Sequence, residues 1–236
     1  MKYQSKLPPV SIDPAVFLRY PNLRVGLIHA RGIDNKLHLD QAHHLLADIA
    51  RYTHRAFHPD NLKSHNLISP WAVAQQEFGA QARHYQTGVE VLLNNVLRGR
   101  SVCANDTATE LARYLSLQKL VPISTEDPAR ISGQIKYSLA NGHEKRNLLL
   151  KLLPGTLYHR DSKRILGTHL DYWKPKQVLP TKKSNSILIH IPILPPVTPA
   201  KLQTILKEFE DLLIEFCGGR YNTAIVSKTQ PHAKWK

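Results

Sequence analysis

The middle of the chain, within residues 71–123, contains two helical patterns joined by a polar turn. The first pattern follows Thr87, which together with Glu90 predicts a capping box, and Gly99 predicts the C-terminal end of the helix. The apolar residues of this pattern recur at the i, i+3, i+4, i+7 spacing of one helical face. They are Val89, Leu92, Leu93 and Val96.

The second pattern opens at Asn105 or Asp106, either of which can cap a helix, and Glu110 lies in its first turn. Its apolar face consists of Ala108, Leu111, Leu115 and Leu120. Pro122 then forces an extended exit from the helix. The two segments are therefore predicted to form an antiparallel helix pair that buries its apolar faces on a sheet.

Further helical and extended patterns flank this pair. An apolar, partly β-branched run over 23–30 predicts a buried strand, and residues 37–57 predict a long amphipathic helix. A last helix is predicted over 199–217, with Thr198 as its cap. Short extended runs fill the second half of the chain, at 133–139, 148–153, 156–160, 165–170, 187–193 and 221–226.

Helices dominate the first half of the chain and strands the second, which predicts an α+β fold with a mixed sheet and packed helices. The length of 236 residues suits one large domain. We expect an N-terminal extension over 1–22, a single domain over 23–227 and a frayed basic tail over 228–236.

The charge balance indicates a polyanionic partner. The chain has 32 Lys and Arg residues against 18 Asp and Glu residues, a formal net charge of +14. Such an excess favours nucleic acid, because each cation near a phosphate releases a condensed counterion on binding. Acidic substrates and membrane surfaces are less favoured alternatives, and the sequence contains no strongly basic amphipathic helix suited to a membrane.

No apolar run approaches the roughly 20 residues that a transmembrane helix needs, and the first residues do not form a signal peptide. We therefore expect a soluble cytoplasmic protein without a membrane partner. Cys103 and Cys217 are isolated in sequence, so neither a disulfide nor a zinc site is expected. His54 and His58 could share a helical face and bind a metal, but they lack an acidic third ligand, and a solvated or phosphate-facing role is favoured.

The common catalytic signatures are absent, including the nucleophile elbow, the phosphate-binding loop and the dinucleotide fingerprint, and no cofactor is expected. Several stretches instead resemble a "Y-x-[ST]-S-V-E-x-L-L-x-R-V-x-x-G" run followed by a helix ending in "S-L-x-x-x-x-P-V". They are residues 85–93, 96–99, 116–117 and 121–123. On these residues the chain resembles the B3/B4 domain, the tRNA-editing module of the phenylalanyl-tRNA synthetase β chain, which also occurs as free-standing proteins.

The resemblance extends through the second half of the chain. Residues 136–144 are similar to a strand ending in "R-x-A-x-x-G-E", 155–161 to a "G-E-x-x-Y-x-D" hairpin, and 171–176 to an aromatic and basic run. It implies hydrolysis of mischarged aminoacyl-tRNA by a positioned water, without a metal or a covalent nucleophile. The implied partner is aminoacylated tRNA, and the implied process is translation quality control.

The resemblance also implies roles for individual residues. Glu144 is expected to bind the substrate α-ammonium group, and His143 or His29 to orient the water, unless His143 is a displaced surface residue. The expected amino-acid pocket is lined by Tyr158, His159 and Thr168. Trp173 is expected to stack on the terminal adenine, or else to be a core or sheet-edge aromatic. Backbone phosphates are expected to contact Lys174, Lys176, Lys182 and Lys183.

The chain departs from the family pattern at several of these positions. Glu110 and Arg113 replace an Asp and an Asn, Thr156 replaces a Glu, and His143 is inserted before Glu144. The competing hypothesis is a non-catalytic tRNA- or RNA-binding module that has lost the editing chemistry, and the inserted His143 and the substituted Glu110 and Arg113 are what would favour it. A third hypothesis is a hydrolase or lyase for a small acidic metabolite. The sequence leaves open the amino acid, the tRNA and the oligomeric state.

Overall fold

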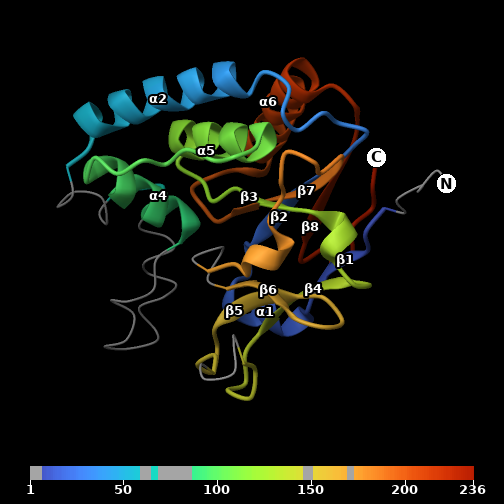
Figure 1. Ribbon diagram of the computed structural model, residues 1–236. Coiled ribbons are helices and arrows are strands. Elements are labelled where there is room, and N and C mark those ends of the chain that lie inside the picture. The colour runs from blue at the N-terminus through green and yellow to red at the C-terminus, as the bar shows by residue number, and fades with distance from the viewer. Residues whose placement is uncertain (1–6, 59–64, 69–86, 146–150, 169–172) are drawn as a thin grey trace.

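Two four-stranded sheets lie at the centre of the molecule (Figure 1). The computed structural model describes residues 7–58, 65–68, 87–145, 151–168 and 173–236. The expected start of the central block near Trp71, and the beginning of the motif at Tyr85, lie outside the described residues. So do residues 171 and 172 of the aromatic and basic run.

The first sheet has the strand order β1-β4-β5-β6 and is mixed. Its strands are β1 (Val10–Ile12), β4 (Ile135–Leu139), β5 (Leu157–Arg160) and β6 (Ile165–Thr168). Strand β1 pairs with β4 in parallel, and the other pairs are antiparallel. The second sheet is antiparallel, with the order β3-β7-β2-β8. Its strands are β3 (Ser124–Glu126), β7 (Ser186–Ile193), β2 (Arg24–Arg31) and β8 (Arg220–Ser227).

Helices cover the outer face of the second sheet, where α6 packs on β2 and α5 contacts both α2 and α6 (Figure 1). These helices are α2 (Leu39–Ala56), α4 (Gly88–Leu97), α5 (Thr107–Lys119) and α6 (Pro199–Cys217). The described chain also has the short helix α1 (Pro14–Arg19) and two 3₁₀ turns, η3 (Pro128–Arg130) and η4 (Lys176–Val178). The α+β class with a mixed sheet and packed helices is thus confirmed, with the strands divided between two sheets.

The helix ends confirm the local signals in the sequence. The side chain of Thr87 accepts a hydrogen bond from the Glu90 N–H, and Glu90 Oε2 accepts one from the Thr87 N–H at 2.6 Å. Asp106 caps α5 by accepting from the Thr109 N–H at 3.0 Å, and Thr198 caps α6. Because the side chains satisfy backbone donors that the helix leaves unpaired, the chain fixes where each helix begins.

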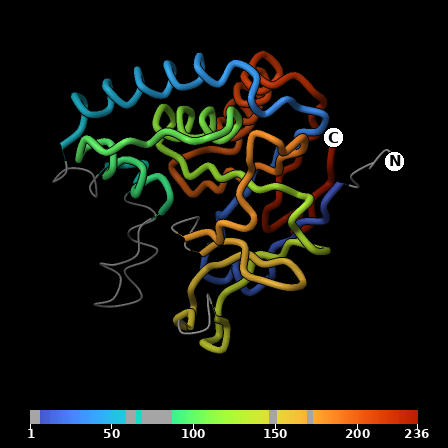
Figure 2. Tube along the Cα trace, in the orientation of Figure 1, coloured from blue at the N-terminus to red at the C-terminus, as the bar shows by residue number. Residues whose placement is uncertain are grey.

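Residues at both chain ends join the first sheet and its neighbours, contrary to the expected extension and frayed tail. Strand β1 lies in the segment expected to be an extension, and its Ile12 N–H donates to the carbonyl of Pro231 at 2.9 Å. Figure 2 shows the C-terminal segment running beside this part of the chain. Trp235 adds a hydrogen bond from Nε1 to the carbonyl of Pro8 at 3.1 Å. A three-residue strand was too short to predict, and pairing over 220 residues of sequence separation leaves no local signal.

The strand predicted over 148–153 is not a regular strand in its described part. Residues 148–150 lie outside the described range, and Lys151 makes only an isolated bridge with Lys145. The prediction rested on a short, nearly continuous apolar run, and such a run does not by itself distinguish a strand from other buried structure.

Two apolar layers result from this arrangement. Residues such as Leu27, Leu157 and Leu188 fill the space between the two sheets, whereas Ile28, Leu111 and Phe209 fill the space between the second sheet and the helices. Alternate residues of β2 therefore face opposite layers, as the period of a strand requires. The second sheet is covered on both faces, which explains why all eight residues of β7 are buried.

Candidate functional site

A group of charged and polar side chains lies buried between the two sheets around Glu126, which is fully buried. Glu126 Oε1 accepts from Lys174 Nζ at 2.7 Å and lies 2.6 Å from His159 Nε2. Its other oxygen, Oε2, lies 3.2 Å from His190 Nε2. We call this group the Glu126 cluster; it consists of Ser124, Glu126, Tyr137, His159, Lys174 and His190.

Strand register explains how these residues meet. In the second sheet Ser124 pairs with His190 and Glu126 pairs with Leu188, so these side chains share the face toward the first sheet. In the first sheet Tyr137 lies directly opposite His159, and their rings stack at 5.0 Å between centroids. Packing of the two sheets therefore brings both sets into one polar layer within an otherwise apolar core.

Lys174 enters this layer from the segment that follows β6. The Thr168 N–H donates to the carbonyl of Trp173 at 3.1 Å, which fixes the backbone immediately before Lys174. The ammonium group of Lys174 donates to Ser124 Oγ at 3.1 Å in addition to Glu126. Its side chain is 10% exposed, so the charge of this lysine lies largely inside the protein.

The cluster perturbs the ionisation of its members. Burial alone raises the pKa of the Glu126 carboxyl, but the charge of Lys174 and the contacts with both histidines outweigh burial and hold that pKa well below its usual range. Burial lowers the pKa of His190 in spite of the neighbouring carboxylate. A buried ion pair stabilises a fold poorly, and perturbed buried groups occur more often at functional sites. The Glu126 cluster is therefore the best candidate for chemistry in the described part of the chain.

A pocket of about 380 Å³ lies beside the cluster, between α4, α5 and β3. We call it the α4–α5 pocket; Lys174 and Ser124 belong to both the pocket wall and the Glu126 cluster. Other polar residues of its wall are Asn95, Ser101, Thr109, Arg113, Ser116 and Thr125. Among the described lining residues none is acidic, so the charged groups of the wall are the cations of Arg113 and Lys174. The volume suits a small ligand of amino-acid size.

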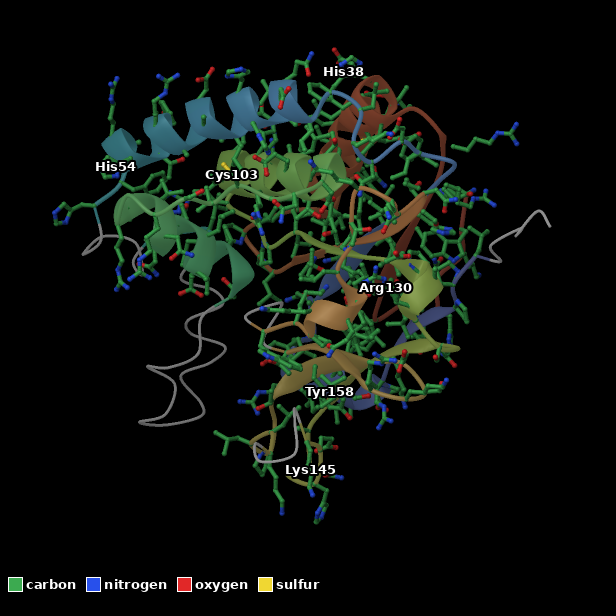
Figure 3. All side chains as sticks on the ribbon, in the orientation of Figure 1. His38, His54, Cys103, Arg130, Lys145 and Tyr158 are labelled. Atoms are coloured by element: carbon green, nitrogen blue, oxygen red, sulfur yellow. The ribbon has the colours of Figure 1, made fainter. Side chains whose placement is uncertain are left out.

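A second buried carboxylate supports the wall of this pocket. Glu110 accepts a hydrogen bond from the Ala104 N–H, and Arg113 donates to the carbonyl of Val102 at 2.9 Å. Burial raises the pKa of Glu110, with the Ala104 hydrogen bond and the nearby His43 acting in the opposite direction. Glu110 and Arg113 therefore hold the segment 101–104, which includes the exposed pocket residue Cys103. Figure 3 shows Cys103 beside α5.

Several residues expected at an amino-acid pocket gather elsewhere, at the end of the first sheet. Glu144 Oε2 accepts from the N–H groups of Asn141 and Gly142 at 2.9 and 3.2 Å, and the Tyr158 hydroxyl lies 3.4 Å from Glu144 Oε1. Burial, followed by the charge of Glu144, raises the pKa of Tyr158. Figure 3 shows Tyr158 among the strands of the first sheet, away from Cys103 beside α5.

The other members of that expected pocket lie close to Tyr158. Trp173 is half-buried and packs against the apolar group that includes Tyr158, and Thr168 is buried and pairs with Trp173 through the backbone. His143 is exposed beside Glu144. None of these described residues, Glu144 included, lines the α4–α5 pocket. Tyr158 and His159 face opposite sides of β5 because neighbouring strand residues alternate, so only His159 reaches the Glu126 cluster.

His29 does not join this group or the Glu126 cluster. It lies fully buried on β2, where its Nε2 is 2.9 Å from Ser186 Oγ. Burial and then the charge of Arg31 lower the pKa of His29 to about 4. A neutral, enclosed imidazole of this kind does not match the expected water-orienting role near Glu144.

The four lysines expected on phosphates divide into two sets. Lys174 was expected to contact a phosphate, but its ammonium group is paired with Glu126 in the interior. Lys176, Lys182 and Lys183 are exposed, and they flank in sequence Leu179, which lines the α4–α5 pocket. Their contact with phosphates stays a prediction.

The sequence interpretation missed Glu126, Tyr137 and His190. A usable signal existed for His190, which is the single ionisable residue within the apolar run 186–193. No comparable signal marks Glu126, because its strand has three residues and its partners lie far away in sequence.

No protein-family model matches the chain, and no curated protein matches it either. In the described ranges no helix is long and apolar enough to cross a membrane. Those same ranges contain no group of three or more His, Cys, Asp or Glu side chains placed to hold a metal ion. His54 instead lies with Nδ1 3.1 Å from the carbonyl of Val96, where it connects α2 to α4.

Proposed function

We propose that the protein hydrolyses the ester bond of mischarged aminoacyl-tRNA, and that the α4–α5 pocket receives the aminoacyl group. The observation that carries the proposal is Lys174, which lines an amino-acid-sized pocket and whose ammonium group pairs with the buried Glu126 at 2.7 Å. The B3/B4 resemblance of the sequence supports the same activity.

An aminoacyl ester is already activated, so hydrolysis depends on positioning a water and stabilising the oxyanion that develops on the ester carbonyl. The role of Lys174 is to supply positive charge to that oxyanion. Glu126 and Ser124 hold the ammonium group at 2.7 and 3.1 Å, which orients it before the substrate arrives. His159 and His190 hold Glu126 in turn, so they act as positioning residues.

The surface around the pocket supports RNA as the carrier of the ester. The chain has a formal net charge of +14, and the exposed Lys176, Lys182 and Lys183 lie within four residues of the pocket residue Leu179 in sequence. Phosphates of an acceptor stem can contact these lysines while the aminoacyl end occupies the pocket. The α-ammonium group then meets neutral oxygens such as Asn95 and Thr125.

A second candidate function rests on the charge of the pocket wall. Arg113 and Lys174 are both cationic, and no described lining residue is acidic. That combination also suits a small acidic metabolite, whose carboxylate or phosphate the two cations would bind. A non-catalytic RNA-binding module is the remaining alternative, and it uses the exposed lysines without the Glu126 cluster.

The test is deacylation of a panel of mischarged tRNAs, including Tyr on tRNA(Phe) and Ser on tRNA(Thr). Lys174→Met should lower the rate by about 100-fold, the loss typical of removing one oxyanion donor. Lys207→Met is the matched control, because it removes the same charge from the exposed outer side of α6. Glu144→Ala tests whether the active site instead lies around Glu144. A loss of deacylation in Glu144→Ala but not in Lys174→Met would place the active site at the end of the first sheet.

Because Lys174→Met leaves the buried Glu126 without its main counter-charge, folding must be measured alongside activity. The double variant Glu126→Gln/Lys174→Met removes both charges and serves as the folded reference. If wild type hydrolyses no member of the panel yet binds tRNA in a salt-sensitive way, the binding-module alternative replaces the proposal. Activity on small acidic esters that does not depend on tRNA would favour the second candidate.

A further inference from the structure

A larger cavity, with a volume of about 1050 Å³, lies at one end of β2, β7 and β8. It shares no lining residue with the α4–α5 pocket. The strand ends that hold Arg31, Ser186 and Arg220 form one wall, and Pro8, Pro9 and Pro128 lie on the other side. We call it the basic cavity.

The two arginines of the basic cavity occupy an unusual position. Arg31 pairs directly with Arg220 between β2 and β8, and with Ser186 between β2 and β7. Residues directly opposite on neighbouring strands project from the same face, so the two arginine side chains leave the sheet side by side. Like charges in this position destabilise a sheet. An anion held between them removes that repulsion.

Nothing acidic compensates the two charges within the described part of the chain. None of the described residues that line the basic cavity is Asp or Glu. Arg31 donates from one terminal nitrogen to Asn222 Oδ1 at 2.7 Å, but its buried Nε has no hydrogen-bond partner there. Arg220 is exposed and makes no ion pair with a described residue. The guanidinium groups of Arg31 and Arg220 therefore keep N–H donors for a ligand. These donors have the planar arrangement that matches phosphate oxygens.

Ser186 adds a hydroxyl to the same wall, but it is not a nucleophile. Its Oγ donates to the carbonyl of Ala30 at 2.9 Å, so the hydrogen bond with His29 runs from His29 Nε2 to Ser186. The hydroxyl proton is thus directed away from the imidazole, and the pair lacks the geometry of a nucleophile with its base. This wall therefore favours binding of a ligand over covalent catalysis.

We propose that the basic cavity binds a nucleoside phosphate, with Arg31 and Arg220 holding the phosphate group. The volume is much larger than a phosphate needs, and the apolar faces of Pro8, Pro9 and Pro128 suit the flat body of a base and its sugar. The nucleoside phosphate can be a free nucleotide or one unit of an RNA chain. This inference does not rest on the proposed hydrolysis, since the two cavities are separate.

The test is titration calorimetry of the full chain with AMP, and with adenosine as the ligand that lacks the phosphate. AMP should bind, and adenosine at least about tenfold more weakly, because hydrogen bonds to a charged group are lost. Arg220→Gln and Arg31→Gln should each weaken AMP binding by at least about tenfold for the same reason. Arg24→Gln is the matched control, since Arg24 lies at the other end of β2 and does not line the cavity.

Melting temperatures guard against misfolding of the variants. AMP should raise the melting temperature of wild type and Arg24→Gln but not that of Arg220→Gln. A second arm measures tRNA affinity at fixed salt. If AMP does not bind but tRNA binds more weakly to Arg220→Gln than to Arg24→Gln, the nucleotide belongs to an RNA. Equal behaviour of the two variants toward both AMP and tRNA overturns the proposal, as does measurable binding of AMP that is no tighter than that of adenosine.

Discussion

Tyr137 and His190 connect the two sheets through a hydrogen bond of 2.7 Å between the tyrosine hydroxyl and His190 Nδ1. The second imidazole nitrogen, Nε2, lies 3.2 Å from the Glu126 carboxylate. A lowered pKa keeps His190 neutral, so one of its nitrogens carries the proton. We infer that attraction to the carboxylate places that proton on Nε2, so that Tyr137 donates to Nδ1.

Tyr137→Phe tests this assignment. The substitution leaves His190 Nδ1 buried without its donor, so the free energy of unfolding should fall by about 1–3 kcal/mol. Urea denaturation measures that loss, and the imidazole nitrogen chemical shifts report the tautomer. An unchanged free energy of unfolding, together with unchanged shifts, would show that the hydroxyl does not fix His190.

Lys174 and Glu126 should show strong energetic coupling. Lys174→Met alone leaves a buried carboxylate without its main counter-charge, which should cost about 3–5 kcal/mol of unfolding free energy. The double variant Glu126→Gln/Lys174→Met should recover a large part of this loss, because both charges leave the core together. A double-mutant cycle by urea denaturation gives the coupling. Additive effects would contradict the buried ion pair.

Acid should destabilise the protein through His29. Its pKa is lowered from 6.5 to about 4 in the folded state, so the unfolded chain binds the extra proton first as the pH falls. The stability that neutral His29 contributes is present above pH 6.5 and is lost as the pH falls toward about 4. The loss amounts to about 3 kcal/mol over that window.

His29→Gln should flatten the pH dependence of the unfolding free energy between about pH 6.5 and 4. His143→Gln is the control, because His143 is exposed and should leave the slope unchanged. An equal slope in wild type and His29→Gln would assign the acid sensitivity to other groups, such as His190.

Gly26 should resist substitution because α6 packs close to β2. A Cβ atom at this position would lie 2.9 Å from Leu202 Cδ1 and 3.1 Å from Leu206 Cδ2. Gly26→Ala should therefore destabilise the protein by about 1–3 kcal/mol, the usual cost of overpacking a core. Leu202→Ala in the same chain should relieve part of that cost, and a melting-temperature cycle of the four proteins measures the relief.

Local patterns predicted much of the fold. The four long helices were predicted within a few residues, since apolar spacing and caps such as Thr87 and Asp106 act within a few residues of sequence. Runs such as 187–193 predicted their strands for the same reason. Strands β1 and β3 were missed because three residues are too few to show alternation. The packed C-terminal segment was missed because its partners lie at the other end of the chain.

For the candidate site, the sequence by itself supplied the residue types and the excess of positive charge, and it brought His159 and Lys174 into consideration. Only the tertiary structure decided that Lys174 pairs with Glu126 and that Arg31 lies beside Arg220. It also decided that His159, and not Tyr158 on the opposite face of β5, reaches Glu126. The physical reason is that side-chain periodicity acts along one strand, whereas strand register and the packing of two sheets join residues that are distant in sequence. Glu126 and His159 are 33 residues apart, and Tyr137 and His190 are 53 apart, so no local pattern relates them.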